Sequence, residues 1–164
     1  MIHLLSSMLL LFAGLPSTSL TGWMQPASFQ LSIGMSEKAA LAHLQDRGWD
    51  VKEGKEKGQK AIDYDEGKSV TLGFSRGRLE SIRFEYVGFV PQVQLAFEEA
   101  RERLRRRRGL PQTSTEKILI YDTPSPLDPS APDVTVILSA DSSTSFGRQG
   151  LGFLVIRYFA PPAK

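Results

Sequence analysis

The chain contains no cysteine, and this absence excludes disulfides, thiolate metal sites, cysteine nucleophiles and a lipid-modified N-terminal cysteine. Histidine is scarce as well, because His43 is the only one beyond the N-terminal apolar block, so no zinc site or histidine-based triad is expected around it. Twenty basic and eighteen acidic side chains leave a formal net charge of +2, which points to no class of partner. The sequence therefore predicts no cofactor and no metal site.

The N-terminal region has no charged side chain before Glu37, and residues 4–13 form an apolar block of about ten residues, the size of the core of a signal peptide. Such a block is too short to span a bilayer. Ser17-Thr18-Ser19 then places small residues where a signal peptidase requires them, and a later cut near Gly22 also fits. We predict an export signal within residues 1–22 and a periplasmic or extracellular protein; a buried first element of the fold or an uncleaved anchor are the alternatives.

The first half of the remaining chain predicts one helix followed by antiparallel strands. Alternation over residues 28–33 predicts a half-buried strand, and Ser36 is a suitable N-cap for a short helix that ends at Gly48. Three further alternating segments predict strands, and their short glycine-containing connectors predict hairpins. These strands are expected at about residues 62–65, 70–74 and 82–86.

The second half has the same order. A helix is predicted from about Pro91 to Arg108, with Gly109 and Pro111 as stop signals, followed by strands at about residues 117–122, 134–139 and 151–159. The last strand is apolar on both faces, so we expect it near the centre of the sheet. An offset of 54 aligns four residues of the two halves, a match that either a tandem repeat or chance could supply. We predict an α+β fold made of a signal (1–22), two helix plus antiparallel-strand units (23–90 and 91–160) and a tail (161–164).

Two short motifs resemble the BamE/SmpA-OmlA family and the related β-lactamase inhibitor proteins. These motifs are Gly34-Met35-Ser36-Glu37 at the helix start, and Leu-Gly-Phe-Ser-Arg-Gly-Arg-Leu at residues 72–79. The resemblance implies an exported, protein-binding scaffold with helices packed on an antiparallel sheet. Without cysteine the chain has neither the lipid anchor of BamE-type proteins nor the disulfides of the inhibitors.

Two sets of residues are candidates for binding a partner. Arg105, Arg106, Arg107 and Arg108 (the arginine cluster) could bind phosphate, acidic lipid or an acidic protein face, or could be a solvated helix end that complements the helix dipole. Aromatic side chains could form a patch on the open side of the sheet, although aromatic residues are also favoured core residues of strands. These aromatic candidates are Trp49, Tyr64, Tyr86, Tyr121 and Tyr158.

Three functions follow as hypotheses. The first is a non-enzymatic protein-binding or inhibitory module that uses the sheet face with the loops at residues 123–132 and 142–150, and whose partner is another exported or envelope protein. The second is an exported hydrolase or small-ligand binder. The third is an envelope-surface protein that contacts the membrane peripherally through the arginine cluster; export argues against nucleic acid. The second hypothesis requires carboxylates to converge among Asp63, Asp65, Asp133 and Asp141.

Overall fold

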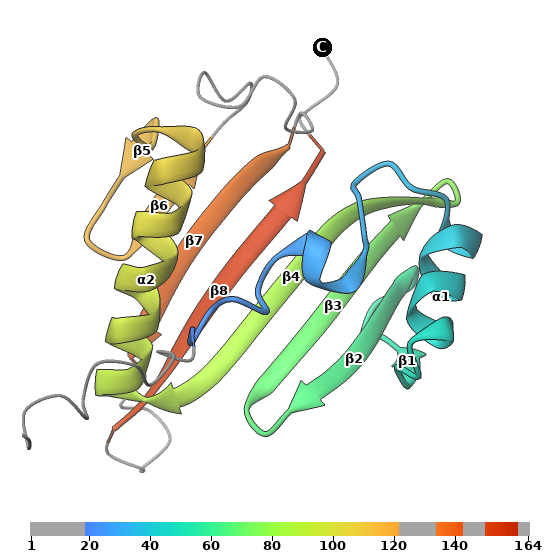
Figure 1. Cartoon of the computed structure of the whole chain (residues 1–164), viewed down its shortest axis with the longest axis horizontal. Helices are drawn as coiled ribbons and strands as arrows, with labels where there is room; N and C mark the ends of the chain where they lie inside the picture. Colours follow the sequence, from blue (N-terminus) through green and yellow to red (C-terminus); the bar gives the residue numbers. More distant parts are fainter. Residues whose placement is uncertain (1–18, 122–133, 143–149, 161–164) are drawn as a thin grey trace, which may run out of the picture.

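The protein is an α+β fold in which two helices pack against one eight-stranded antiparallel sheet (Figure 1). The computed structural model describes residues 19–121, 134–142 and 150–160. The strands lie in the order β1-β2-β3-β4-β8-β7-β6-β5. Their bounds are β1 Val51–Glu53, β2 Gln59–Asp65, β3 Lys68–Ser75, β4 Arg78–Phe89, β5 Thr113–Ser114, β6 Ile118–Tyr121, β7 Thr135–Ser142 and β8 Leu151–Phe159.

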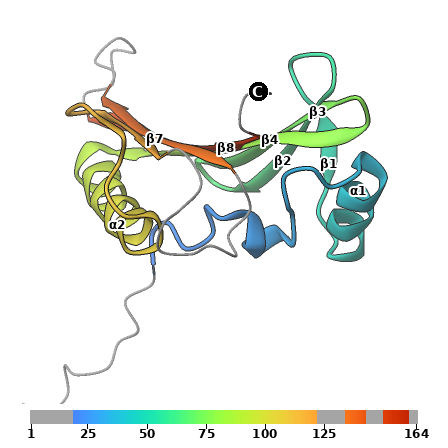
Figure 2. The ribbon, with the colours of Figure 1, turned by 90° about the horizontal axis from the view of Figure 1, so that it is seen from above.

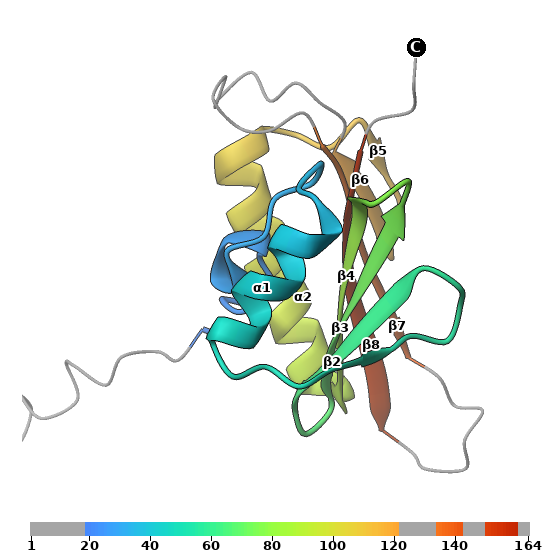
Figure 3. The same cartoon turned by 90° about the vertical axis from the view of Figure 1, so that its right-hand side faces the viewer.

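Both helices lie on the same face of the sheet, as the two side views show (Figure 2, Figure 3). Helix α1 spans Glu37–Asp46, and α2 spans Val90–Arg108. The hydroxyl of Ser36 accepts a hydrogen bond from the Ala39 N–H at 3.3 Å, which confirms the predicted N-cap. The helices therefore divide the sheet into a helix face and an open face.

The sheet consists of two four-stranded meanders joined edge to edge. Strands β1 to β4 follow α1, β5 to β8 follow α2, and β4 pairs with β8 from Ser81↔Phe159 to Phe89↔Leu151. The predicted fold class is confirmed, and β8 lies centrally as expected. Four strands follow each helix instead of the predicted three, because β1 and β5 are edge strands too short to show a period in the sequence.

The two helices bury equivalent positions. The fourth and eighth residues of α1, Ala40 and Leu44, are buried, as are the fourth and eighth residues of α2, Val93 and Phe97. Each pair is 53 positions apart, one fewer than the offset of 54 that the sequence suggested. The correspondence thus rests on the buried residues of the two helices and not on the residues that align at an offset of 54.

The segment from residue 19 to residue 31, which we call the strap, crosses the helix face between α1 and α2 (Figure 1, Figure 2). The prediction of a strand at residues 28–33 is wrong. Pro26–Phe29 form a 3-10 turn, and Gln30 adopts a left-handed conformation with φ 55°, which is incompatible with an extended strand. The alternating apolar residues Phe29 and Leu31 are nevertheless buried, under the turn instead of in the sheet.

The core fills the space between the helix face, the helices and the strap. It contains the inward residues of all six longer strands, with Phe84 of β4 at its aromatic centre beside Trp23, Phe29 and Tyr158. α2 approaches the sheet closely at Gly152, where a Cβ atom would lie 3.3 Å from the Cβ of Val93. The strap is therefore part of the folded domain's interior.

Candidate functional site

The open face is the largest surface of the sheet that no described element covers (Figure 2, Figure 3). Successive side chains of a strand point to opposite faces, so the residues that alternate with the buried core positions lie on the open face. The apolar ones are half-buried by their strand neighbours, apart from Phe89 and Ile118, which are 63% and 42% exposed. The apolar members are Val87, Phe89, Ile118, Ile120, Ile137, Leu151, Phe153, Val155 and Phe159.

The open face carries apolar and polar side chains, and one row across its centre changes from apolar to polar. One cross-strand row runs from Ile120 of β6 through Ile137, Arg157 and Arg83 to Thr71 of β3. Side chains opposite each other in such a row are direct neighbours on one face. In this row the apolar residues Ile120 and Ile137 belong to β6 and β7, and the charged residues Arg157 and Arg83 meet at the β8–β4 boundary.

Two arginines occupy this boundary. Arg83 of β4 and Arg157 of β8 are register partners, which places like charges directly opposite each other. Arg83 forms an ion pair with Glu85, whereas Arg157 is exposed and makes no ion pair or hydrogen bond with the described residues. The Nε of Arg83 is buried without a hydrogen-bond partner there. The centre of the open face thus has unused capacity to bind a negatively charged group.

The aromatic candidates from the sequence lie on the helix side. Tyr121 and Tyr158 are buried, and burial raises the pKa of each hydroxyl. Trp49, Tyr64 and Tyr86 are half-buried and pack against the core, and Tyr64 stacks between Trp23 and Trp49 at centroid distances of 4.9 and 5.2 Å. These five residues therefore serve the core and do not form a patch on the open face.

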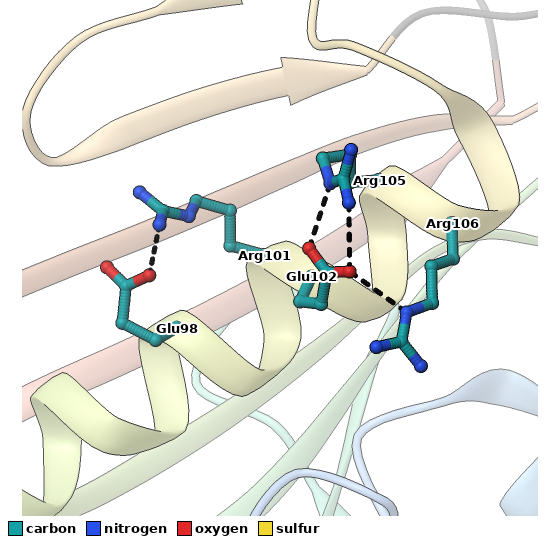
Figure 4. A network of polar contacts seen from close by, with 5 residues as sticks. All are labelled: Glu98, Arg101, Glu102, Arg105 and Arg106. Atoms are coloured by element: carbon teal, nitrogen blue, oxygen red, sulfur yellow. Dashed lines mark hydrogen bonds and ion pairs between the residues drawn. The ribbon is translucent and has the colours of Figure 1, made fainter.

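The arginine cluster is divided among separate partners. Arg105 and Arg106 both bind Glu102, with Nε to carboxylate distances of 2.8 and 2.9 Å (Figure 4). Hydrogen bonds from these two arginines lower the pKa of Glu102 to about 2. Arg107 donates to the Gln25 side chain, and Arg108 donates to the Val134 carbonyl, each at 2.8 Å. The positive field of the cluster is correspondingly reduced.

The carboxylates named in the second hypothesis do not converge. Asp63 pairs with Lys52 at 2.8 Å, Asp65 with Lys68 at 3.0 Å, and Asp141 with Lys117 at 3.4 Å. Four strand spacings separate β2 from β7, which is about 19 Å. Asp133 lies outside the described residues. Within the described part of the chain, no group of three or more His, Asp or Glu side chains is arranged to hold a metal ion.

A hollow of about 450 Å³ lies between α2 and strands β7 and β8, with Val93, Phe97 and Ala140 among its apolar lining residues. The polar residues in its wall are all exposed to solvent, and Lys117 and Asp141 bind each other; these residues are Gln94, Glu98, Glu116, Lys117 and Asp141. None of the buried unpartnered polar atoms of the described residues belongs to this wall. The hollow therefore lacks the convergent polar groups of a small-molecule site.

The residues that define the open face were not singled out from the sequence. The sequence did contain an indication of this face, because residues 151–159 are apolar on both sides of the strand. That pattern fits either a strand buried on both faces or a strand with one buried face and one exposed apolar face. Only the position of both helices on the same side distinguishes the two. Ile137, Val155 and Arg157 thus become candidate binding residues through the fold alone.

Comparison with family models, with curated proteins and with solved structures gives no match for this chain. Among the described residues, no helix combines the length and apolar character needed to cross a membrane. The function must therefore be argued from the surface of the molecule itself.

Proposed function

We propose that this protein is an exported, non-enzymatic binding module that docks a partner protein on the open face of its sheet. The observation that carries the proposal is the composition of this face: apolar side chains from β4, β6, β7 and β8 lie around Arg157, which has no ion-pair or hydrogen-bond partner among the described residues. Contiguous apolar surface rimmed by charge is typical of protein interaction sites. The resemblance to BamE-type and inhibitor proteins implies the same class of function.

The partner's chemistry follows from the two arginines. A partner carboxylate placed between Arg83 and Arg157 would relieve their repulsion and could accept hydrogen bonds from both guanidinium groups. The partner is therefore a protein that presents apolar side chains beside an aspartate or glutamate. A second copy of this chain fits less well, because docking two open faces about a two-fold axis through their centres would bring Arg157 against its own mate.

Docking by strand addition is disfavoured at both edges of the sheet. The edge strands β1 and β5 have three and two residues, so each offers few backbone groups to an added strand. The face, not the edge, is the larger recognition surface. On the open side, the connection between β1 and β2 also projects beyond the sheet, so the open face has a raised border at its β1 edge (Figure 2, Figure 3).

Photo-crosslinking from defined positions tests this proposal. A photoreactive residue is placed at Val155 on the open face or, as the matched control, at Leu95 on the outer side of α2, which is 64% exposed. The proposal predicts one dominant acidic-surfaced partner crosslinked from position 155 and not from position 95. Equal crosslinking from both positions, a product that is only a second copy of the chain, or no crosslink from position 155 would contradict it.

A further inference from the structure

The strap is joined to α2 by a compact set of hydrogen bonds. Glu99, in the middle of α2, accepts from the Leu20 N–H at 3.0 Å, from the Thr21 N–H at 3.1 Å and from the Thr21 hydroxyl at 2.6 Å. The hydroxyl of Ser19 donates to the same carboxylate. Arg103 donates to the carbonyl and hydroxyl of Thr21 at 2.8 and 2.7 Å. Glu99 and Arg103 therefore form a clamp on residues 19–21.

The clamp discriminates between the two cleavage positions that the sequence allows. Thr21 is fully buried, so a cut after Gly22 would remove a core residue and leave Glu99 and Arg103 without their partners. A cut after Ser19 would keep Thr21 in place. It would also leave the new terminal nitrogen, that of Leu20, at the position from which it already donates to Glu99.

We propose that the export signal is removed between Ser19 and Leu20, and that the clamp then holds the new terminus. In this step a signal peptidase of the exporting cell adds water across the Ser19–Leu20 peptide bond. The Ser19 carbonyl becomes the carboxylate of the released peptide, and the Leu20 nitrogen becomes an α-ammonium group. The Glu99 carboxylate then binds a charged donor in place of an amide and the Ser19 hydroxyl.

The sequence at the scissile bond agrees with this assignment, because Ser17 and Ser19 supply the small residues that precede such cuts. Ser17 itself lies outside the described residues. Cleavage of a translocating chain precedes folding, so the packing of the strap does not obstruct the peptidase. The inference rests on the predicted export signal and is independent of the docking surface.

Intact-mass measurement tests the cleavage position. The full chain, with its own N-terminus, is expressed in a bacterium that exports proteins, and the product is purified from the periplasm. The expected mass is that of residues 20–164. A product that starts at Trp23 or elsewhere beyond Leu20, or a product that keeps residues 1–19, would overturn the proposal. The intact mass is measured on the native chain and therefore does not depend on the stability of any variant.

The thermal midpoint of the same product, compared with Glu99→Gln, tests the role of the clamp. An ammonium that gains a carboxylate partner has a raised pKa, so its stabilisation is complete below the ordinary α-amino pKa of about 8 and is lost as the pH rises through the folded value. The advantage of the native protein over Glu99→Gln should therefore shrink above about pH 8. A constant advantage would show that no charged terminus binds Glu99.

The other charged groups around Glu99 and Arg103 are Glu102, Arg106 and Arg107. Glu102, whose pKa is lowered to about 2, is ionised near pH 8, and Tyr158, which faces Arg103, has a pKa raised by burial. Arginine side chains do not lose their proton in proteins. The change can therefore be attributed to the terminus. Glu102→Gln is the matched control, because Glu102 lies on α2 three residues after Glu99 and has no hydrogen bond to the strap. The thermal midpoint of Glu102→Gln should change with pH in parallel with that of the native protein.

Discussion

Arg83 in β4 and Arg157 in β8 lie directly opposite each other in the register of the sheet, at the centre of its open face. Glu85 compensates Arg83 only, because Arg157 has no partner among the described residues. Like charges in this arrangement destabilise a sheet. An unfavourable pair of charges on an accessible surface is expected where the amino acid at a position serves binding and not the stability of the fold.

We predict that Arg157→Leu stabilises the free protein. Removing the repulsion and extending the apolar row from Ile137 should raise the free energy of unfolding by about 0.2–1 kcal/mol. Urea denaturation of the purified protein measures the change. Lys38→Leu, which removes the same charge from an exposed site on α1, is the control and should have little effect. A destabilised Arg157→Leu would show that the arginine supports the fold.

The two buried tyrosines should respond differently to loss of their hydroxyl groups. Tyr158 donates to the Met24 carbonyl at 3.2 Å, whereas the hydroxyl of Tyr121 is buried with no partner among the described residues. Tyr158→Phe should therefore cost about 1 kcal/mol, and Tyr121→Phe should be neutral or stabilising. Thermal or urea unfolding compares the two. The reverse order would contradict the described packing of the strap on β8.

The sequence predicted the framework of the fold because its signals are local. The cap at Ser36, the stop at Gly109 and the period of residues 70–74 and 82–86 are each determined by a few neighbouring residues. The strap was misassigned because alternation at Phe29 and Leu31 fits both a strand and an irregular segment that inserts every second residue into the core. Only tertiary packing decides between them.

The candidate site depends on information that no local pattern contains. Arg83 and Arg157 are 74 positions apart and become neighbours through the pairing of β4 with β8. The aromatic residues chosen from the sequence, among them Tyr121 and Tyr158, lie in the core because their strands turn those positions toward the helices. The arginine cluster is evident in the sequence as four consecutive arginines. The pairing of two of them with Glu102 depends on helix geometry, which places residues three and four apart side by side.

Acid should weaken the native protein partly through Glu99. Burial opposes ionisation of this carboxylate, but in the full-length chain hydrogen bonds from Ser19, Leu20 and Thr21 together hold its pKa below the ordinary value of 4.5. The contacts from Leu20 and Thr21 remain after cleavage behind Ser19. A group with a lowered folded pKa stabilises the protein above its unfolded pKa, and this contribution is lost as the pH falls through the folded value. Glu99→Gln should therefore lower the midpoint at neutral pH and flatten its decline below pH 4.5.

Circular dichroism melts across an acidic pH series measure this effect. Glu80→Gln, which changes an exposed carboxylate on β4, is the control. An acid limb of the same slope in Glu99→Gln and in the native protein would contradict the described role of the strap contacts.

Membrane association through the arginine cluster should be weak until Glu102 is removed. Glu102→Gln frees Arg105 and Arg106, and each freed arginine near an anionic surface is worth about 1 kcal/mol. Co-sedimentation with phosphatidylserine-containing vesicles should therefore rise several-fold at low salt. Glu98→Gln makes the same charge change beside Arg101, outside the cluster (Figure 4). Strong binding of the native protein to these vesicles would contradict the prediction and would show that the arginine cluster attaches the protein to membranes.

The central claim is that the open face binds a partner with an acidic group. The most direct measurement is quantitative recovery of the crosslinked partner from the native envelope fraction by three proteins that each carry the photoreactive residue at position 155: the otherwise native chain, Arg157→Glu and Leu95→Glu. We predict that charge reversal at Arg157 reduces recovery at least tenfold, while Leu95→Glu, on the outer side of α2, recovers the partner as the native chain does. Equal recovery by the native chain and Arg157→Glu would contradict the account.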